Sequence, residues 1–349
     1  MIICAAILLA LCIYKMKFAK FHCDYMCMDQ TGSIKGIFAV IIFLSHIRQY
    51  SGIVFSADTI VIWVLNRIGQ LMVTLFFFYS GFGVLRSYEK KREYSNNFFK
   101  NRIFKTWIHF ATAVMLYFIL SLIIGKKYQL TDYLFAWVGW TALGNSNWFV
   151  FVMLSLYVVT WFVFLLIGNR FAEKRNVVLA IGVSVLSCAL WLGLFFAGKQ
   201  SLWYNTLLCY PFGMWFGVFK QKFDNLISNF QIRIGIILVV ACVFAVLYLV
   251  PNVAAYSLCA CLFCLLVTLL TTMVKFDNNV LRWLGKYSFE IYIIQRIPMI
   301  ILSECGMFRQ EEMFFLLTIL TTGLLAVVLK KVYFIVDPIF SRGRNQSKV

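Results

Sequence analysis

Residues 148–168 read WFVFVMLSLYVVTWFVFLLIG, a run of 21 residues without a charge. A helix needs about 20 such residues to cross the roughly 30 Å hydrocarbon layer of a bilayer. Further apolar runs lie at residues 36–54, 59–85, 106–125, 177–197, 203–219, 234–250, 253–274, 287–302 and 313–336. The sequence therefore predicts an all-α protein, a polytopic transmembrane helical bundle of about ten or eleven spans.

Two further segments are apolar but less regular. Met1 to Tyr14 is short and is followed by lysines, so we expect a first span or half-span there rather than a signal peptide. Residues 130–143 are aromatic and poorly delimited, which suggests an interfacial or re-entrant piece. We divide the chain into residues 1–28, a short hydrophobic span with a basic cytoplasmic linker, and residues 29–349, one membrane domain with a short cytoplasmic tail.

The composition excludes a large soluble domain. Hydrophobic residues make up 62% of the chain and charged residues only 13%, whereas soluble domains carry about 25% charged residues. No polar segment is long enough to cover this much apolar surface.

The net charge of +18 would suit nucleic acid, but its placement indicates membrane topology instead. If the spans alternate from an external N-terminus, 25 of the 32 Lys and Arg residues lie in cytoplasmic segments. We therefore expect a multi-pass cell-membrane protein with its N-terminus outside, its C-terminus in the cytoplasm, the lipid bilayer around it and no nucleic-acid partner.

The 11 cysteines do not form a metal-binding pattern. Cys259, Cys261 and Cys264 lie inside an apolar run, where small buried residues pack between helices. We expect no metal site, and the sequence does not imply disulfides.

Lys35 and His46 are the first pair of residues that suggest chemistry. They are 11 residues apart, which brings them to within about 20° of the same helix face and about 16 Å apart along the axis. Ionisable groups are costly inside a membrane and commonly mark functional sites. A histidine that only packs against a neighbouring span is the alternative.

The second candidate region is FFFYSGFGVLRSYEKKREYSNNFFKNRIFK at residues 76–105. Ser80 and Gly81 allow helices to approach closely. Arg102 and Lys105 are three residues apart, so they project from one side of a helix and suit phosphate binding. The alternative for this basic segment is the ordinary cytoplasmic excess of positive charge and attraction to anionic lipid.

Other charges also fall in or near expected spans, namely Arg48, Arg67, Glu290 and Arg296. They must pair with one another or line a wet cavity, but the sequence does not assign the pairs. Asn147-Trp148-Phe149 opens a span, where Trp is common at the membrane interface.

In their order along the chain, these pieces resemble the membrane acyltransferase family 3. The resemblance covers about residues 29 to 336 and rests on Lys35-Gly36-Ile37 leading to His46, FFFYSGF at 76–82, Phe98-Phe99 with Arg102-x-x-Lys105, Asn147-Trp148-Phe149, and LRWLGKYSFEIYIIQ at 281–295. It implies about ten spans, an acyl-coenzyme A donor, usually acetyl-coenzyme A, and an acceptor hydroxyl on a cell-surface glycan or lipid-linked sugar.

The family's Arg-x10-His motif falls on Lys35 and His46, and its Arg-x-x-Arg motif falls on Arg102 and Lys105. Lys replaces one Arg in each motif, which keeps the charge but loses bidentate geometry. Gln295 stands where the family often has a histidine in a late span, which weakens any role for a second histidine.

Together the residues and the resemblance predict an O-acyltransferase with His46 as general base. Lys35 would orient His46 or neutralise charge. Arg102 and Lys105 would hold the nucleotide phosphates, and Ser80 and Gly81 would let helices pack close to the donor tunnel. No Ser or Cys stands next to a base in a way that suggests a covalent relay, so direct attack is the simpler mechanism. A carrier or flippase for a glycan or lipid-linked intermediate is the main alternative, and a glycan polymerase is the third.

Overall fold

The computed structural model describes residues 10, 13–51, 69–168 and 174–341. The expected first span at residues 1–14 and the start of the apolar run 59–85 lie mostly outside the described residues, as does Arg67. Arg170 and the basic tail from residue 342 lie outside them too.

The described residues are mostly helical. The long and medium helices are α2 (Met28–Ser51), α4 (Leu71–Lys90), α5 (Lys105–Ile123), α7 (Trp148–Ile167), α8 (Arg175–Phe196), α9 (Cys209–Ile227), α10 (Phe230–Leu249), α11 (Val253–Thr271) and α15 (Glu311–Ser341). The short helices are η1 (Arg92–Tyr94), η2 (Phe99–Phe104, a π-helix), α6 (Leu130–Ala136), η3 (Ser201–Trp203), α12 (Asn279–Lys286), α13 (Ser288–Ile294), α14 (Arg296–Glu304) and η4 (Met307–Arg309). Strands β1 (Met16–Phe18) and β2 (Val274–Phe276) form one small sheet.

Eight helices among the described residues are long and apolar enough to cross a membrane. They are α2, α4, η2 continued by α5, α7, α8, α10, α11 and α15. Their outward surfaces are apolar, as on α10, where Leu238 and Val246 are 60% and 64% exposed. Such surfaces suit lipid rather than water. The prediction of an all-α polytopic membrane bundle is confirmed.

Two expected spans take a different form. The run 203–219 corresponds to α9, whose second half carries Lys220, Lys222 and Asp224, so α9 is not among the eight. The run 287–302 is divided between α13 and α14. Pro298 explains the break, because its nitrogen has no proton to donate to the preceding turn of helix.

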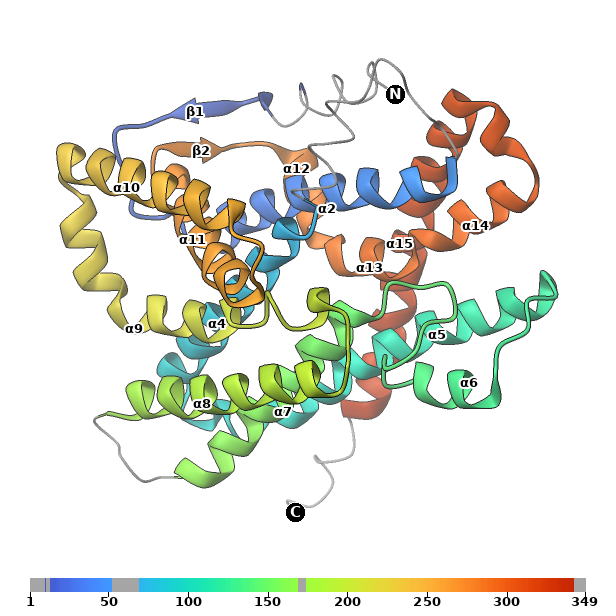
Figure 1. Ribbon diagram of the computed structural model, residues 1–349, viewed down its shortest axis with the longest axis horizontal. Coiled ribbons are helices and arrows are strands. Elements are labelled where there is room, and N and C mark those ends of the chain that lie inside the picture. Colours follow the sequence, from blue (N-terminus) through green and yellow to red (C-terminus); the bar gives the residue numbers. More distant parts are fainter. Residues whose placement is uncertain (1–9, 11–12, 52–68, 169–173, 342–349) are drawn as a thin grey trace.

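Close helix contacts depend on glycines. A Cβ atom at Gly81 of α4 would collide with the backbone oxygen of Tyr210 in α9, and one at Gly285 of α12 would collide with the backbone oxygen of Gly32 in α2. Because glycine has no side chain, the backbones of these pairs approach directly. These two contacts fix α4 against α9 and α12 against α2, which runs across the upper half of the view in Figure 1.

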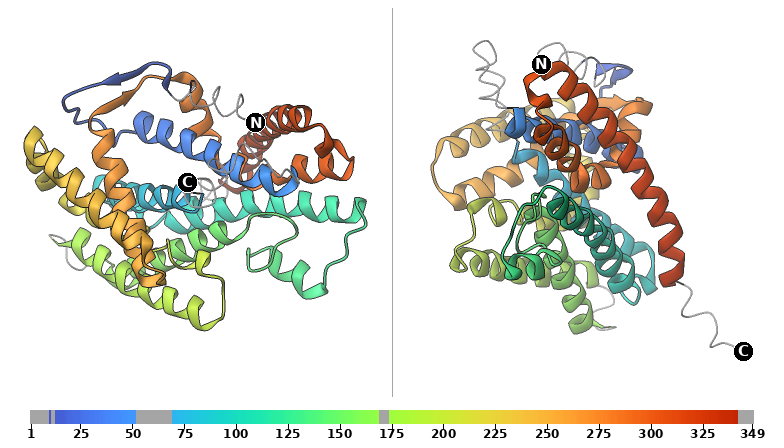
Figure 2. Two further views of the ribbon diagram at one scale, coloured as in Figure 1. Left: turned by 45° about the horizontal axis from the view of Figure 1, so that its top comes forward. Right: turned by 90° about the vertical axis from the view of Figure 1, so that its right-hand side faces the viewer.

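Segments from distant parts of the described chain meet at the start of α2. β1 pairs with β2 in antiparallel register, with Met16 opposite Phe276. The Gln30 amide near the start of α2 both donates to and accepts from the backbone of Phe276. α15 runs as one long helix along the side of the molecule (Figure 2). The start of α2 is therefore held in place by segments distant in sequence.

The segment 130–143 begins as helix α6 and continues without regular structure towards α7. Asn145, Ser146 and Asn147 at its end are buried. The Asn147 side chain donates a hydrogen bond of 2.6 Å to the Gly139 carbonyl, which holds the irregular segment in a compact form. Irregular backbone is tolerated inside membrane proteins where it is enclosed by protein or lines a cavity.

Candidate active site

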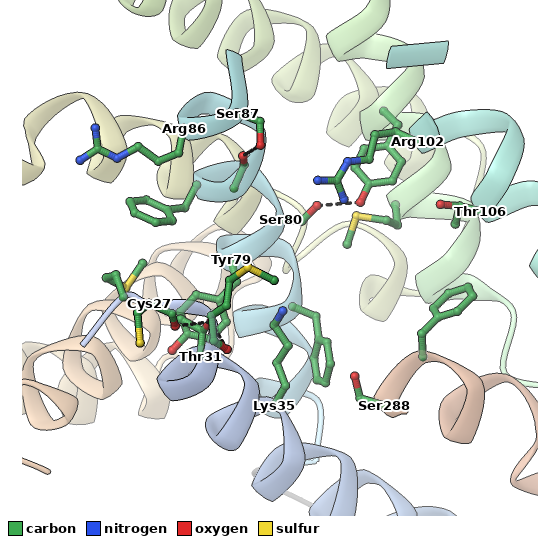
Figure 3. A pocket seen from close by; sticks show the side chains of 18 of the residues that line it. Cys27, Thr31, Lys35, Tyr79, Ser80, Arg86, Ser87, Arg102, Thr106 and Ser288 are labelled. Carbon is green, nitrogen blue, oxygen red and sulfur yellow. Dashed lines mark hydrogen bonds between the residues drawn. The ribbon is translucent and has the colours of Figure 1, made fainter. Parts of the chain in front are cut away.

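A cavity of about 1210 Å³ lies between α2, α4, η2, α5, α7 and α13. Residues on α2 line it at helical spacing, with Lys35, Ala39 and Ile42 on one face. Tyr79 and Ser80 of α4 form the opposite wall (Figure 3). We call this space the basic cavity, because Lys and Arg side chains dominate its charged lining.

Cations dominate the lining of the basic cavity. Among the described residues they are Lys35, Arg86, Lys90, Lys91, Arg102, Lys105 and Lys220, against a single carboxylate, Asp24. Three of the cations have carboxylate partners: Arg86 with Glu89, Lys220 with Asp224 and Lys105 with Asp337, each at 2.5 Å. The remaining positive charge is available to a bound anion.

Lys35 and Arg102 are the half-buried members of this remaining set. Lys35 from α2 and Arg102 from η2 point into the cavity from two sides, with Ser80 between them (Figure 3). Within the described part of the chain, neither has a carboxylate within 4.0 Å. The Lys35 ammonium lies 5.9 Å from the centre of the Tyr79 ring, which gives partial compensation through a cation–π contact.

Tyrosines orient the groups around Arg102. The Arg102 Nε donates to the Tyr94 hydroxyl at 3.2 Å. Burial raises the pKa of the Tyr94 phenol, although Arg102 beside it acts in the opposite direction. The phenol therefore stays neutral and does not cancel the guanidinium charge. Ser80 shares a hydrogen bond of 2.8 Å with the Tyr157 hydroxyl, which fixes the Ser80 side chain at the cavity wall.

The structure gives Ser80 and Gly81 different positions. Ser80 lines the basic cavity, whereas Gly81 faces away from it and contacts α9. Gly81 is therefore the small residue that lets two helices pack closely. Ser80 is part of the wall of the basic cavity.

Lys105 also lines the cavity, but in an ion pair. Its ammonium lies 2.5 Å from Asp337 of α15, and the other oxygen of Asp337 lies 3.1 Å from the His109 Nε2. The His109 ring stacks on Tyr333 with centroids 3.6 Å apart. The sequence reasoning missed this cluster, because 228 residues separate His109 from Asp337 and no local pattern connects them.

His46 lies beyond the end of the basic cavity. It is on α2, one turn after Ile42, which lines the cavity. The ring of Tyr292, another lining residue, lies 6.2 Å from the His46 ring. The sequence correctly places Lys35 and His46 on one helix, α2. The basic cavity extends along α2 from Lys35 to Ile42, one turn before His46.

Two side chains hold the His46 ring. The Gln295 Nε2 donates to His46 Nδ1 at 2.8 Å, and the Ser146 hydroxyl lies 3.4 Å from His46 Nε2. Gln295 is fully buried, and its Oε1 has no partner among the described residues. Gln295 thus stands where the family often has a second histidine, and its side chain contacts His46. Ser146, which comes from the irregular segment before α7, gave no signal in the sequence.

The structure also assigns partners to the other charges in the spans. Glu290 lies 3.2 Å from the Lys330 ammonium. Arg296 donates to the Gln49 side chain at 2.8 Å and to the Tyr50 hydroxyl at 3.5 Å. Glu290 and Arg296 therefore do not pair with each other, and Arg296 stands close to the His46 end of α2.

Comparison with known proteins identifies the family of the chain. The acyltransferase domain family matches residues 33–330, which is most of the chain. The chain belongs to acyltransferase family 3. The match begins just before Lys35 and ends at Lys330, so it contains the basic cavity except for the lining residues between Cys23 and Thr31. This membrane acyltransferase has no significant match among curated proteins or among solved structures.

Proposed function

We propose that this membrane acyltransferase moves an acyl group, normally acetyl, from acyl-coenzyme A to a hydroxyl of a cell-surface glycan or lipid-linked sugar. The observation that carries the proposal is a large cavity, rich in cations without carboxylate partners, that ends beside a histidine. Coenzyme A bears several phosphates and a long uncharged arm, so it needs both a cationic region and a deep channel.

Arg102 and Lys35 are the residues best suited to hold the phosphates. Both are half-buried, where a charge is weakly screened and its attraction to phosphate is strong. Lys105 is less suited than the sequence predicts, because Asp337 already neutralises it. Lys90 and Lys91 are exposed and would add mainly a diffuse attraction.

His46 would act as general base. The acceptor oxygen attacks the thioester carbonyl carbon while His46 takes the hydroxyl proton; the carbon–sulfur bond then breaks, and the imidazolium returns the proton to the leaving thiolate. The balanced products are an ester and free coenzyme A. Lys35 is about three turns away on α2, so we assign it to the donor phosphates rather than to the orientation of His46.

A base at His46 also requires a defined orientation of Gln295. With Nε2 of Gln295 donating to Nδ1, the neutral ring carries its proton on Nε2 and has no free lone pair. Turning the amide by 180° exchanges its oxygen and nitrogen without moving the rest of the side chain. Oε1, otherwise unpartnered, then accepts from Nδ1–H, while the amide gives up its 3.4 Å contact with the Tyr292 carbonyl. The His46 Nε2 lone pair, which lies 3.4 Å from the Ser146 hydroxyl, is then the one that takes the proton of the acceptor.

In this proposal the basic cavity opens to the cytoplasm, where acyl-coenzyme A is found. The excess of Lys and Arg at this end supports that orientation. The C-terminus would be cytoplasmic and the N-terminus external.

The direct test uses the purified full-length protein in lipid nanodiscs. Binding of coenzyme A is measured by calorimetry, and transfer is measured with radiolabelled acetyl-coenzyme A and membranes of the source cell. We expect saturable binding and label in the glycan or lipid-linked sugar fraction. Binding of no coenzyme A, together with movement of a lipid-linked sugar across the bilayer, would establish a carrier instead.

A further inference from the structure

A second, smaller cavity lies on the other side of His46. Its volume is about 120 Å³, and its lining includes Tyr50, Tyr117, Ser121, Gly144 and Glu304. Tyr50 is one turn after His46 on α2, just as Ile42 of the basic cavity is one turn before it. Gly144 is two residues before Ser146, which contacts His46. His46 therefore stands between the two cavities.

Buried polar side-chain atoms without partners gather around His46 and the small cavity. Among the described residues, ten buried side-chain atoms have no hydrogen-bond partner, and four of them belong to Tyr117, Tyr292, Gln295 and Arg296. Tyr117 is only 1% exposed and lines the small cavity with its hydroxyl unsatisfied. Such atoms cost free energy unless water or a ligand completes their hydrogen bonds.

The charge of the small cavity differs from that of the basic cavity. Its described lining holds one cation and one carboxylate, Lys126 and Glu304, both exposed. The other polar groups are hydroxyls, from tyrosines and from Ser121 and Ser303. A polyphosphate does not fit this balance of charge. A neutral hydroxylated ring does, because it donates to the carboxylate and exchanges hydrogen bonds with the hydroxyls.

We propose that the small cavity is the acceptor site and binds a neutral sugar residue, with Tyr117 contacting one of its hydroxyls. The inference rests on the proposed function, since a base between two cavities receives the donor from one and the acceptor from the other. The sugar enters at the end that carries Lys126 and Glu304 and presents its reacting hydroxyl to His46. Arg296 supports this wall through its hydrogen bond to Tyr50.

The test is Tyr117→Phe, which removes one hydroxyl and keeps the ring. Because that hydroxyl has no partner among the described residues, the change should not lower the melting temperature. Ser187→Ala is the matched control: it also removes a buried, unpartnered hydroxyl, but from α8 and away from both cavities. Both variants are assayed in nanodiscs for coenzyme A binding and for acetyl transfer to source-cell membranes.

We expect Tyr117→Phe to reduce kcat/KM for the membrane acceptor by about 10- to 100-fold while the Kd for coenzyme A stays unchanged. Ser187→Ala should match the wild type in both assays. Unchanged transfer by Tyr117→Phe would overturn the acceptor site, as would an equal loss of coenzyme A binding, which would place Tyr117 with the donor. A wild-type protein that neither binds coenzyme A nor transfers acetyl groups would instead refute the proposed function.

Discussion

Around Lys35, α2 faces a cavity lined by cations; around His46, eleven residues further on, the same helix faces amide and hydroxyl groups. At the first end, Lys35 and Arg102 lack carboxylate partners in the described chain and suit a polyanion. At the second end, Gln295 and Ser146 fix the histidine ring by hydrogen bonds.

The difference shows how one helix can separate two tasks. Charge attracts a phosphate-bearing donor over several ångströms, whereas proton transfer needs an atom at hydrogen-bond distance and a fixed tautomer. Placing both tasks on one face of α2, about three turns apart, lets a long donor satisfy both at once. Substitutions at the two ends of α2 should therefore have different effects.

The largest effect is expected at the His46 end. His46→Ala should lower acyl transfer by about 10²- to 10⁴-fold, the usual cost of removing a general base, and should leave coenzyme A binding near the wild-type value. Transfer is measured with radiolabelled acetyl-coenzyme A, and the melting temperature serves as the control for folding. A stable variant with full activity would show that His46 only packs against its neighbours.

The next effect is expected at the Lys35 end, in affinity rather than in rate. Arg102→Ala should raise the Kd for acyl-coenzyme A by about 10- to 150-fold, the loss of one charge-assisted phosphate contact, with a larger effect at low salt.

Two matched controls remove a cation from the same cavity. Lys90→Ala should change the Kd little because Lys90 is exposed. Lys105→Ala should have an intermediate effect because Asp337 already neutralises Lys105. Equal effects from all three substitutions would mean that the cavity attracts the donor only as a diffuse positive surface.

A smaller effect is expected when Gln295 is replaced, and two different replacements distinguish the two orientations of its amide. Gln295→Glu places an acceptor-only group beside His46 Nδ1, so it should retain transfer if the amide oxygen normally accepts from Nδ1–H. Gln295→Met removes the hydrogen bond and should lower kcat by about 10-fold, the loss of one buried hydrogen bond, with KM for the donor unchanged. If Gln295→Glu were as inactive as Gln295→Met while both kept the wild-type melting temperature, the amide would act as a donor, and His46 Nε2 would not be the base.

Part of this site can be predicted from local sequence. Helical period alone joins Lys35 to His46, and the small residues around Gly81 indicate close helix contact. Partners that come from distant helices cannot be predicted in this way. Gln295 is 249 residues from His46, and Asp337 is more than 200 residues from Lys105.

Helical periodicity shows which residues share one face of a helix, but it does not show which other helix packs against that face. Lys105 illustrates the consequence. Its i, i+3 spacing from Arg102 predicts a second phosphate ligand, yet of these two cations only Arg102 lacks a carboxylate neighbour among the described residues. The irregular segment that carries Ser146 has no period at all, so its approach to His46 follows only from the folded structure.

The last prediction concerns which side of the membrane the Lys35 end and the His46 end of α2 face. It is tested by a labelling pattern rather than by a rate. If the basic end is cytoplasmic, Asn96, which is exposed near that end, should be inside, and Cys305, which is exposed next to Glu304 of the small cavity, should be outside. Two variants are compared, each with one cysteine, at the native Cys305 or at Asn96→Cys. A membrane-impermeant maleimide should label Cys305 in intact cells and label the cysteine at position 96 only after permeabilisation. The reverse pattern would put the basic cavity outside, away from cytoplasmic acyl-coenzyme A, and would remove the physical reason for assigning the donor to the Lys35 end.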